Sequence, residues 1–139
     1  METKFFNEMQ KVADLNNDCK HWISTFKFMD EEQIFIRKLL ESYVFEPNTP
    51  NLFERLQDYK MRLIEEKKLM QTIENKVLAH ENILGGMLEC NQEQGDVAFY
   101  NTHNALKMEV LHSFEAFKIL KSEIFNYAGG ILKNRKPEY

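Results

Sequence analysis

Apolar residues recur at alternating intervals of three and four positions through most of this chain. That spacing keeps one face of an α-helix turned inward, because a helix completes one turn in about 3.6 residues. The first run lies between residues 5 and 43 and consists of Phe5, Val12, Leu15, Cys19, Trp22, Phe26, Met29, Ile36, Leu40 and Tyr43. The pattern predicts one long amphipathic helix in the first third of the chain.

Two further runs have the same spacing. The second consists of Leu56, Tyr59, Leu63, Met70, Ile73, Val77, His80, Leu84 and Met87. The third consists of His103, Leu106, Val110, Phe117, Leu120, Ile124 and Ile131, with a face widened by Leu111, Phe114 and Phe125. We therefore expect three long helices and no β-sheet.

Two polar stretches separate the three runs. FEPNTPN at residues 45–51 contains two prolines, which cannot continue a helix. CNQEQGD at residues 90–96 contains a glycine and offers Asn91 or Asp96 as an N-cap. These boundaries predict helices at about residues 4–45, 51–89 and 96–133, and a tail at residues 134–139. At 139 residues the chain fits a single domain, residues 1–139.

Helix length and short reversals together determine the architecture. At about 1.5 Å per residue, such helices extend for roughly 50 to 60 Å. Short reversals make consecutive helices antiparallel neighbours. The predicted fold class is all-α: an elongated up-down-up bundle of three long helices with coiled-coil-like packing.

Three local features complicate this pattern. DEEQ at residues 30–33 resembles a capping box, so the first helix is either continuous or kinked or broken near residue 29. We favour one long helix, because the apolar spacing passes through Asp30 without a slip. Gly85 and Gly86 predict either fraying of the second helix or the close approach of another backbone. AGG at residues 128–130 is a candidate break in the third helix.

Composition limits the partners of the chain. It has 18 basic and 22 acidic residues and a formal net charge of -4, so no general positive field attracts nucleic acid or anionic lipid. No apolar run reaches the roughly 18 residues of a membrane span, and the first residues lack the apolar core of a signal peptide. We expect a cytoplasmic protein that binds neither nucleic acid nor a membrane.

Two histidines occupy core positions of the pattern, His80 in the second helix and His103 in the third. Residues equidistant from a reversal lie opposite each other in antiparallel helices. A reversal centred near residue 92 places His80 close to His103, and one centred near residue 48 brings Cys19 to the same level. The sequence therefore predicts that His80, His103 and Cys19 share one layer, which makes them candidate metal ligands.

This layer has two interpretations. Imidazole and thiolate are good ligands for zinc and other transition metals, and Glu81 lies on the flank of the three side chains. Alternatively, the histidines are neutral and bonded to each other, to Asn104 or to a backbone carbonyl, with no metal. We favour the second interpretation, because Lys76 and Lys107, one turn away, would oppose a bound cation.

Gln33 and Glu66 interrupt the apolar faces of the first two helices, near the opposite end of the bundle. Equidistance from residue 48 places them within about one helical turn of each other. We expect a hydrogen bond between Gln33 and Glu66 that fixes the register of the helices at some cost in stability. The functional alternative is a carboxylate that carries a proton in catalysis.

The chain lacks catalytic and phosphate-binding motifs. Its glycine pairs are not followed by lysine and serine or threonine, and neither G-x-S-x-G nor HExxH occurs. Four apolar side chains fall outside the core spacing, namely Phe28, Ile34, Phe35 and Phe53. A second chain could cover them, so we expect a homodimer. The predicted function is a non-enzymatic helical bundle for protein–protein interaction, without a cofactor; the alternative is a small metal-binding or redox bundle that uses His80 and His103.

Overall fold

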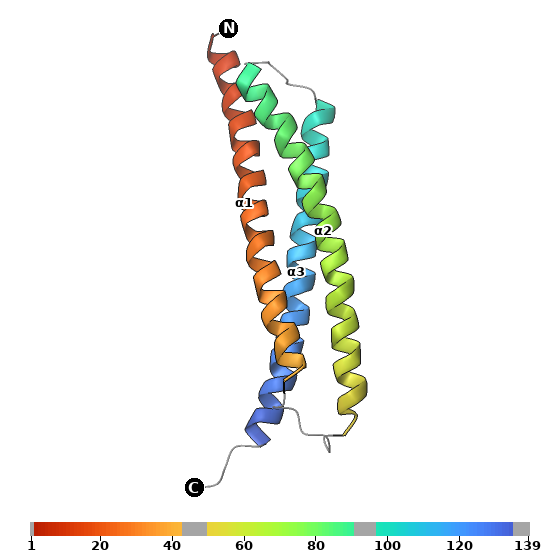
Figure 1. Ribbon diagram of the computed structural model, residues 1–139. Coiled ribbons are helices and arrows are strands. Elements are labelled where there is room, and N and C mark those ends of the chain that lie inside the picture. Colours follow the sequence, from red (N-terminus) through yellow and green to blue (C-terminus); the bar gives the residue numbers. More distant parts are fainter. Residues whose placement is uncertain (1, 43–49, 91–96, 135–139) are drawn as a thin grey trace.

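The computed structural model consists of three long helices (Figure 1). It describes residues 2–42, 50–90 and 97–134 and, within them, the side chains of residues 11–42, 50–86 and 100–130. Helix α1 comprises Glu2–Leu40, α2 comprises Leu52–Cys90 and α3 comprises Val97–Asn134. The described part of the chain contains no strand, so the all-α prediction is confirmed.

The helices form an elongated bundle with the predicted up-down-up order. In Figure 1, α1 runs downward, α2 returns beside it and α3 runs downward again. The 39 residues of α1 extend for roughly 58 Å at about 1.5 Å per residue. Packing is most extensive between α1 and α2 and least extensive between α1 and α3. Helix α2 is therefore the central element that both other helices contact.

Helix α1 is continuous. It runs without interruption through Asp30, so the alternative of a new helix beginning there is wrong and the expectation of one long helix is confirmed. Met29 and Gln33, on either side of Asp30, are both buried. Because the same face is buried before and after the capping-box sequence, packing favours propagation of the helix over a new start.

Helix α1 ends earlier than expected, at Leu40 rather than near residue 45. The amide of Ser42 donates to the carbonyl of Leu39 at 3.1 Å, a bond across three residues that tightens the last turn. The sequence that follows, YVF at residues 43–45, has low helix propensity. The two prolines beyond it are therefore not needed to stop the helix.

Helices α2 and α3 begin close to the predicted positions. Asn51 has a left-handed backbone with a φ of 57°, a conformation that asparagine tolerates better than most residues. Its carbonyl accepts a hydrogen bond from the amide of Arg55 at 3.0 Å. The proposed N-caps of α3, Asn91 and Asp96, lie outside the described residues. So do the side chains of Phe5, Tyr43, Met87 and Ile131, which the spacing assigned to the core.

One hydrophobic core runs along the bundle and consists mainly of residues from the three predicted runs, together with Leu52 and Ala128. Its largest fully buried apolar side chains are Phe26, Ile36, Leu40, Met70, Leu84, Phe117 and Ile124. The rings of Phe26 on α1 and Phe114 on α3 pack edge to face, with centroids 4.8 Å apart. The apolar spacing therefore identified the buried face of each helix correctly.

Ion pairs join the helices along the edges of this core. They are Arg62–Glu123 at 2.7 Å and Lys76–Glu109 at 3.1 Å between α2 and α3, and Lys121–Glu32 at 2.8 Å between α3 and α1. Arg62–Glu123 and Lys76–Glu109 are exposed and contribute about 0.2–1 kcal/mol each, whereas Lys121–Glu32 is partly buried. None of the three described helices combines the length and the hydrophobicity that a membrane span requires.

The glycine pairs do not interrupt the helices. Helix α2 continues past Gly85 and Gly86 to Cys90, and α3 continues past residues 128–130 to Asn134, so the expected break in α3 is wrong. A Cβ atom added at Gly85 or Gly86 would meet no atom within 4 Å. Among the described residues, the expected close approach of another backbone to Gly85 or Gly86 is therefore absent as well.

The double substitution Gly85→Ala and Gly86→Ala is expected to stabilise the protein by about 1–2 kcal/mol, because alanine has higher helix propensity and restricts the unfolded chain. Urea unfolding followed by circular dichroism measures the change. The control is the reverse substitution Ala79→Gly at an exposed position of α2, which should cost about 1 kcal/mol. If the two alanines destabilised the protein, the helix packing at Gly85 and Gly86 would require residues without a side chain.

Candidate functional site

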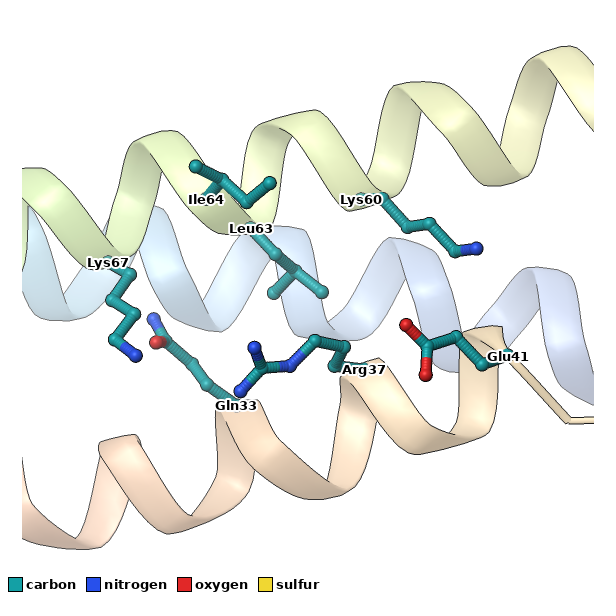
Figure 2. A pocket seen from close by; sticks show the side chains of 7 residues that line it. All are labelled: Gln33, Arg37, Glu41, Lys60, Leu63, Ile64 and Lys67. Atoms are coloured by element: carbon teal, nitrogen blue, oxygen red, sulfur yellow. The ribbon is translucent and has the colours of Figure 1, made fainter.

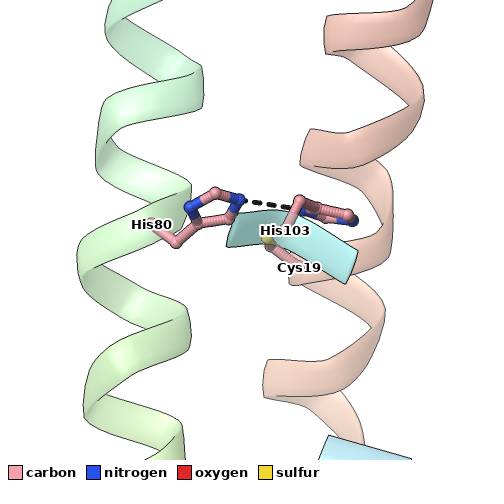
Figure 3. Close-up of side chains that lie close together, drawn as sticks. All are labelled: Cys19, His80 and His103. Carbon is pink, nitrogen blue, oxygen red and sulfur yellow. Dashed lines mark hydrogen bonds between the residues drawn. The ribbon is translucent and has the colours of Figure 1, made fainter. Parts of the chain in front are cut away.

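Cys19 of α1, His80 of α2 and His103 of α3 meet in one layer of the bundle (Figure 3). Their residues are 0%, 6% and 1% exposed. One ligand atom from each, a sulfur and two ring nitrogens, lies within 4.8 Å of the other two. The layer that antiparallel pairing predicted is therefore present, whereas metal binding stays a prediction.

A chain of hydrogen bonds crosses this layer. Nε2 of His103 lies 3.2 Å from Oδ2 of Asp18, and Nδ1 of His103 lies 2.9 Å from Nε2 of His80. A carboxylate only accepts hydrogen bonds, so Nε2 of His103 donates to Asp18. When His103 is neutral, its Nδ1 is the acceptor and His80 donates from Nε2. Asp18 thus selects the tautomer of both imidazoles.

Aromatic packing holds the ring of His103 in place. Trp22, one turn after Cys19, stacks on His103 with ring centroids 5.2 Å apart and an interplanar angle of 26°. The ring of His80 lies 5.0 Å from that of His103 at an angle of 35°. These ring contacts, together with two hydrogen bonds, restrict rotation of His103. Its imidazole is therefore positioned before any ligand is present.

Burial determines the protonation of the thiol and of the second imidazole. Burial, followed by the negative charges of Asp18 and Glu81, raises the pKa of the Cys19 thiol to about 12, so this group is protonated at neutral pH. Burial and the neighbouring His103 lower the pKa of His80 from its ordinary value, so His80 is neutral there. Burial therefore favours the uncharged forms of both Cys19 and His80.

The lysines that were expected to oppose a cation lie in solvent. Lys76 forms an ion pair with Glu109 at 3.1 Å, and the two side chains are 53% and 47% exposed. Lys107 is also exposed. Water and counterions screen charges in such positions. The sequence-based objection to a metal ion is therefore weaker than the spacing alone suggested.

An open groove between α2 and α3 reaches this layer from the surface. Its volume is about 460 Å³, and its lining includes Ala79, His80, Thr102 and Ala105. The groove therefore offers small solutes a path from solvent to the buried imidazole.

Asp18 is the member of this cluster that sequence reasoning missed. It immediately precedes Cys19, and its side chain is 47% exposed, at the edge of the core. The sequence did contain a signal for it, because Asp18 is a carboxylate next to Cys19, a core position that was expected at the level of His103. Trp22 was recognised as a core residue but not as the residue that stacks on His103.

The expected hydrogen bond between Gln33 and Glu66 is absent. Gln33 is 5% exposed and donates from Nε2 to the sulfur of Met70 at 3.3 Å. Burial raises the pKa of Glu66, and its interactions with His112 and Arg62 partly oppose this shift. Glu66 therefore interacts with α3 and its own helix rather than with α1. Distance from a reversal predicted the level of each residue but not the side of α2 on which it lies.

A smaller pocket lies beside Gln33, between α1 and α2 (Figure 2). Its volume is about 130 Å³, and it is lined by Gln33, Arg37, Glu41, Lys60, Leu63, Ile64 and Lys67. Among the described residues, no carboxylate lies within ion-pair distance of its three basic side chains. None of the residues that line it is a histidine, cysteine, serine or threonine.

The four candidate interaction residues are all exposed. The exposed fractions are 61% for Phe28, 45% for Ile34, 61% for Phe35 and 74% for Phe53. Phe28 and Phe35 are seven residues apart and therefore share one face of α1, which Ile34 adjoins. Phe53 lies on another helix, at the start of α2. The sequence therefore located exposed apolar side chains, two of which, Phe28 and Phe35, form one strip on α1.

Other apolar side chains are exposed that the sequence reasoning did not single out for contact. They are Met61, Ile64, Leu69, Leu78, Ile83, Met108, Leu111, Ile119 and Phe125. Leu111 and Phe125, which were expected to widen the buried face of α3, are 46% and 39% exposed. The apolar face of α3 is therefore narrower than expected.

No family model matches this chain, and no curated protein and no solved structure shows significant similarity to it.

Proposed function

We propose that this protein is a non-enzymatic helical-bundle module that pairs with a second copy of itself through the outer face of α1. The observation that carries the proposal is the exposure of Phe28 and Phe35, each 61% exposed, on one face of a helix. Ile34, 45% exposed, lies to one side of this strip. Exposed apolar side chains that share a face favour association, because contact removes them from water.

The charges beside this strip are complementary in an antiparallel pair. Glu31 and Lys38 are exposed, and neither forms an ion pair with another described residue. If two copies of α1 cross at a two-fold axis level with Ile34 and Phe35, Glu31 of each copy faces Lys38 of the other. Ile34 of each copy then faces Phe35 of the other. Two-fold symmetry makes each favourable contact twice.

Phe53 supplies a further apolar contact in this proposal. It is 74% exposed and lies at the start of α2, at the same end of the bundle as the last turns of α1. A helix that lies along α1 can reach this end. The proposed module works in the cytoplasm, where reducing conditions keep a thiol such as Cys19 free.

Phe35→Glu is expected to weaken self-association by about 100-fold or more, because it places a charge at two symmetry-related contacts at once. Sedimentation equilibrium of the purified chain measures the dimer dissociation constant. The matched control is Met108→Glu on α3, where the replaced side chain is 68% exposed but lies on another helix. This control should leave the dissociation constant unchanged.

Charge reversal tests the antiparallel arrangement. Glu31→Lys and Lys38→Glu should each weaken the dimer by about tenfold, because each creates two like-charge contacts, and the double reversal should restore association. Failure of the double reversal to restore association would rule out this pairing. A parent chain that stays monomeric at high micromolar concentration would contradict the proposed function as a whole.

A further inference from the structure

The layer of Cys19, His80 and His103 contains the donor atoms of a transition-metal site. Zinc bonds of about 2.3 Å to sulfur and about 2.0–2.1 Å to nitrogen, in a tetrahedral arrangement, place ligand atoms roughly 3.3–3.6 Å apart. The two imidazole nitrogens are 2.9 Å apart, and all three ligand atoms lie within 4.8 Å of one another. Displacement of the donor atoms by about an ångström, through rotation of the side chains, therefore gives the spacing of ligands around a zinc ion.

The residues around this layer have a second property of metal sites. A histidine ligand commonly donates its other ring N–H to a carboxylate, which orients the ring and increases its basicity. His103 does this through Nε2, 3.2 Å from Asp18, and so its Nδ1 faces the interior of the layer. Trp22 packs against the same ring. The hydrogen bond to Asp18 and the stacking on Trp22 therefore fix the orientation of the His103 ring.

We propose that Cys19, His80 and His103 bind one divalent transition-metal ion, best matched by zinc, through Sγ, Nε2 and Nδ1 respectively, with Asp18 as a positioning residue. The groove that reaches His80 between α2 and α3 gives the ion access from solvent and leaves a fourth position for water. This site is separate from the exposed side chains of Phe28, Ile34 and Phe35, so it does not depend on self-association.

Protons and charges balance in this site. Cys19 releases its thiol proton when its sulfur binds the ion, and His80 takes the tautomer with its proton on Nδ1, which frees Nε2 as a ligand. The two positive charges of the ion are then balanced by the thiolate, which binds the ion, and by the carboxylate of Asp18, which accepts a hydrogen bond from Nε2 of His103. Sulfur and imidazole donors select zinc, copper or cobalt over magnesium and calcium, which prefer oxygen ligands.

The test is a titration of the full-length, chelator-treated chain with Co(II), which serves as a spectroscopic substitute for zinc. We expect an equimolar complex with a thiolate-to-cobalt charge-transfer band in the near ultraviolet, release of about one proton per metal ion, and loss of the band when zinc is added. Calorimetry with zinc should give the same stoichiometry. Absence of a stoichiometric complex with either ion would overturn the proposal.

Matched variants identify the ligands. Cys19→Ser, a nearly isosteric change, should abolish the charge-transfer band, whereas Cys90→Ser, which removes the other thiol of the chain, should retain it. His80→Gln should weaken zinc binding, and His112→Gln, at an exposed position of α3, should not. Circular dichroism of the metal-free variants shows that each is folded. A charge-transfer band that persists in Cys19→Ser would exclude Cys19 and overturn this ligand set.

Asp18 has a test of its own. Asp18→Asn should weaken zinc binding by about 10- to 100-fold, because it removes the charge that orients His103. The melting temperature of the metal-free variant should stay close to that of the parent, because Asp18 is half exposed. Asp14→Asn, one turn earlier at an exposed position, is the control. An unchanged zinc affinity in Asp18→Asn would overturn the positioning role.

Discussion

Phe26→Ala is expected to lower the free energy of unfolding by about 3–5 kcal/mol, a large part of the stability of a typical domain. Phe26 is 0% exposed and its ring packs edge to face against Phe114, with centroids 4.8 Å apart. The substitution removes a contact between α1 and α3, the two helices that touch least. The resulting cavity lies at the centre of a long bundle, where few side chains can move to fill it.

Phe28→Ala is the matched control, because it makes the same chemical change two residues away on the same helix. Phe28 is 61% exposed, so its loss should change the stability of the monomer by about 0.5 kcal/mol or less. Urea unfolding at submicromolar concentration separates this effect from self-association, which would stabilise the parent by mass action. Comparable losses in the two variants would contradict the register of α1.

The fold could be predicted because one periodic signal extends along almost the whole chain. A face of seven to ten regularly spaced core positions in each helix outweighs local signals such as the capping-box sequence at Asp30 or the glycines of α2. Each local signal is worth roughly 1 kcal/mol, whereas burial of a single large apolar side chain contributes about 1.5–3 kcal/mol. The end of α1 was harder to predict, because only weak propensities distinguish Leu40 from residue 45.

The candidate site was predicted in part, for a geometric reason. In antiparallel helices, the distance of a residue from the reversal predicts its height along the bundle axis. That height was enough to predict the contact between His80 and His103, because both residues lie in the shared core. The distance does not specify the side of a helix, so it failed for Gln33, which contacts Met70 rather than Glu66. Asp18 was missed for the same reason. It lies at the border of the core, and the distance from a reversal does not show whether such a residue points toward a neighbouring helix or toward solvent.

His103→Ala is expected to cost about 2–4 kcal/mol in the metal-free protein. The substitution leaves a cavity beside Trp22 and removes the hydrogen-bond acceptor of the buried His80, which is 6% exposed. His112→Ala, at an exposed position of the same helix, should change stability by about 0.5 kcal/mol or less. Chemical denaturation in the presence of a chelator measures both values.

A double-mutant cycle with His80→Ala isolates the hydrogen bond between the imidazoles. We expect the double variant to cost less than the sum of the single variants, with a coupling of about 0.5–3 kcal/mol, because the two rings contact each other. Strict additivity would show that the 2.9 Å contact contributes nothing to stability. The coupling also bears on metal binding, because a metal ion must separate these two nitrogens before both can act as ligands. A strong coupling in the metal-free protein is therefore a free energy that the bonds to the metal have to offset.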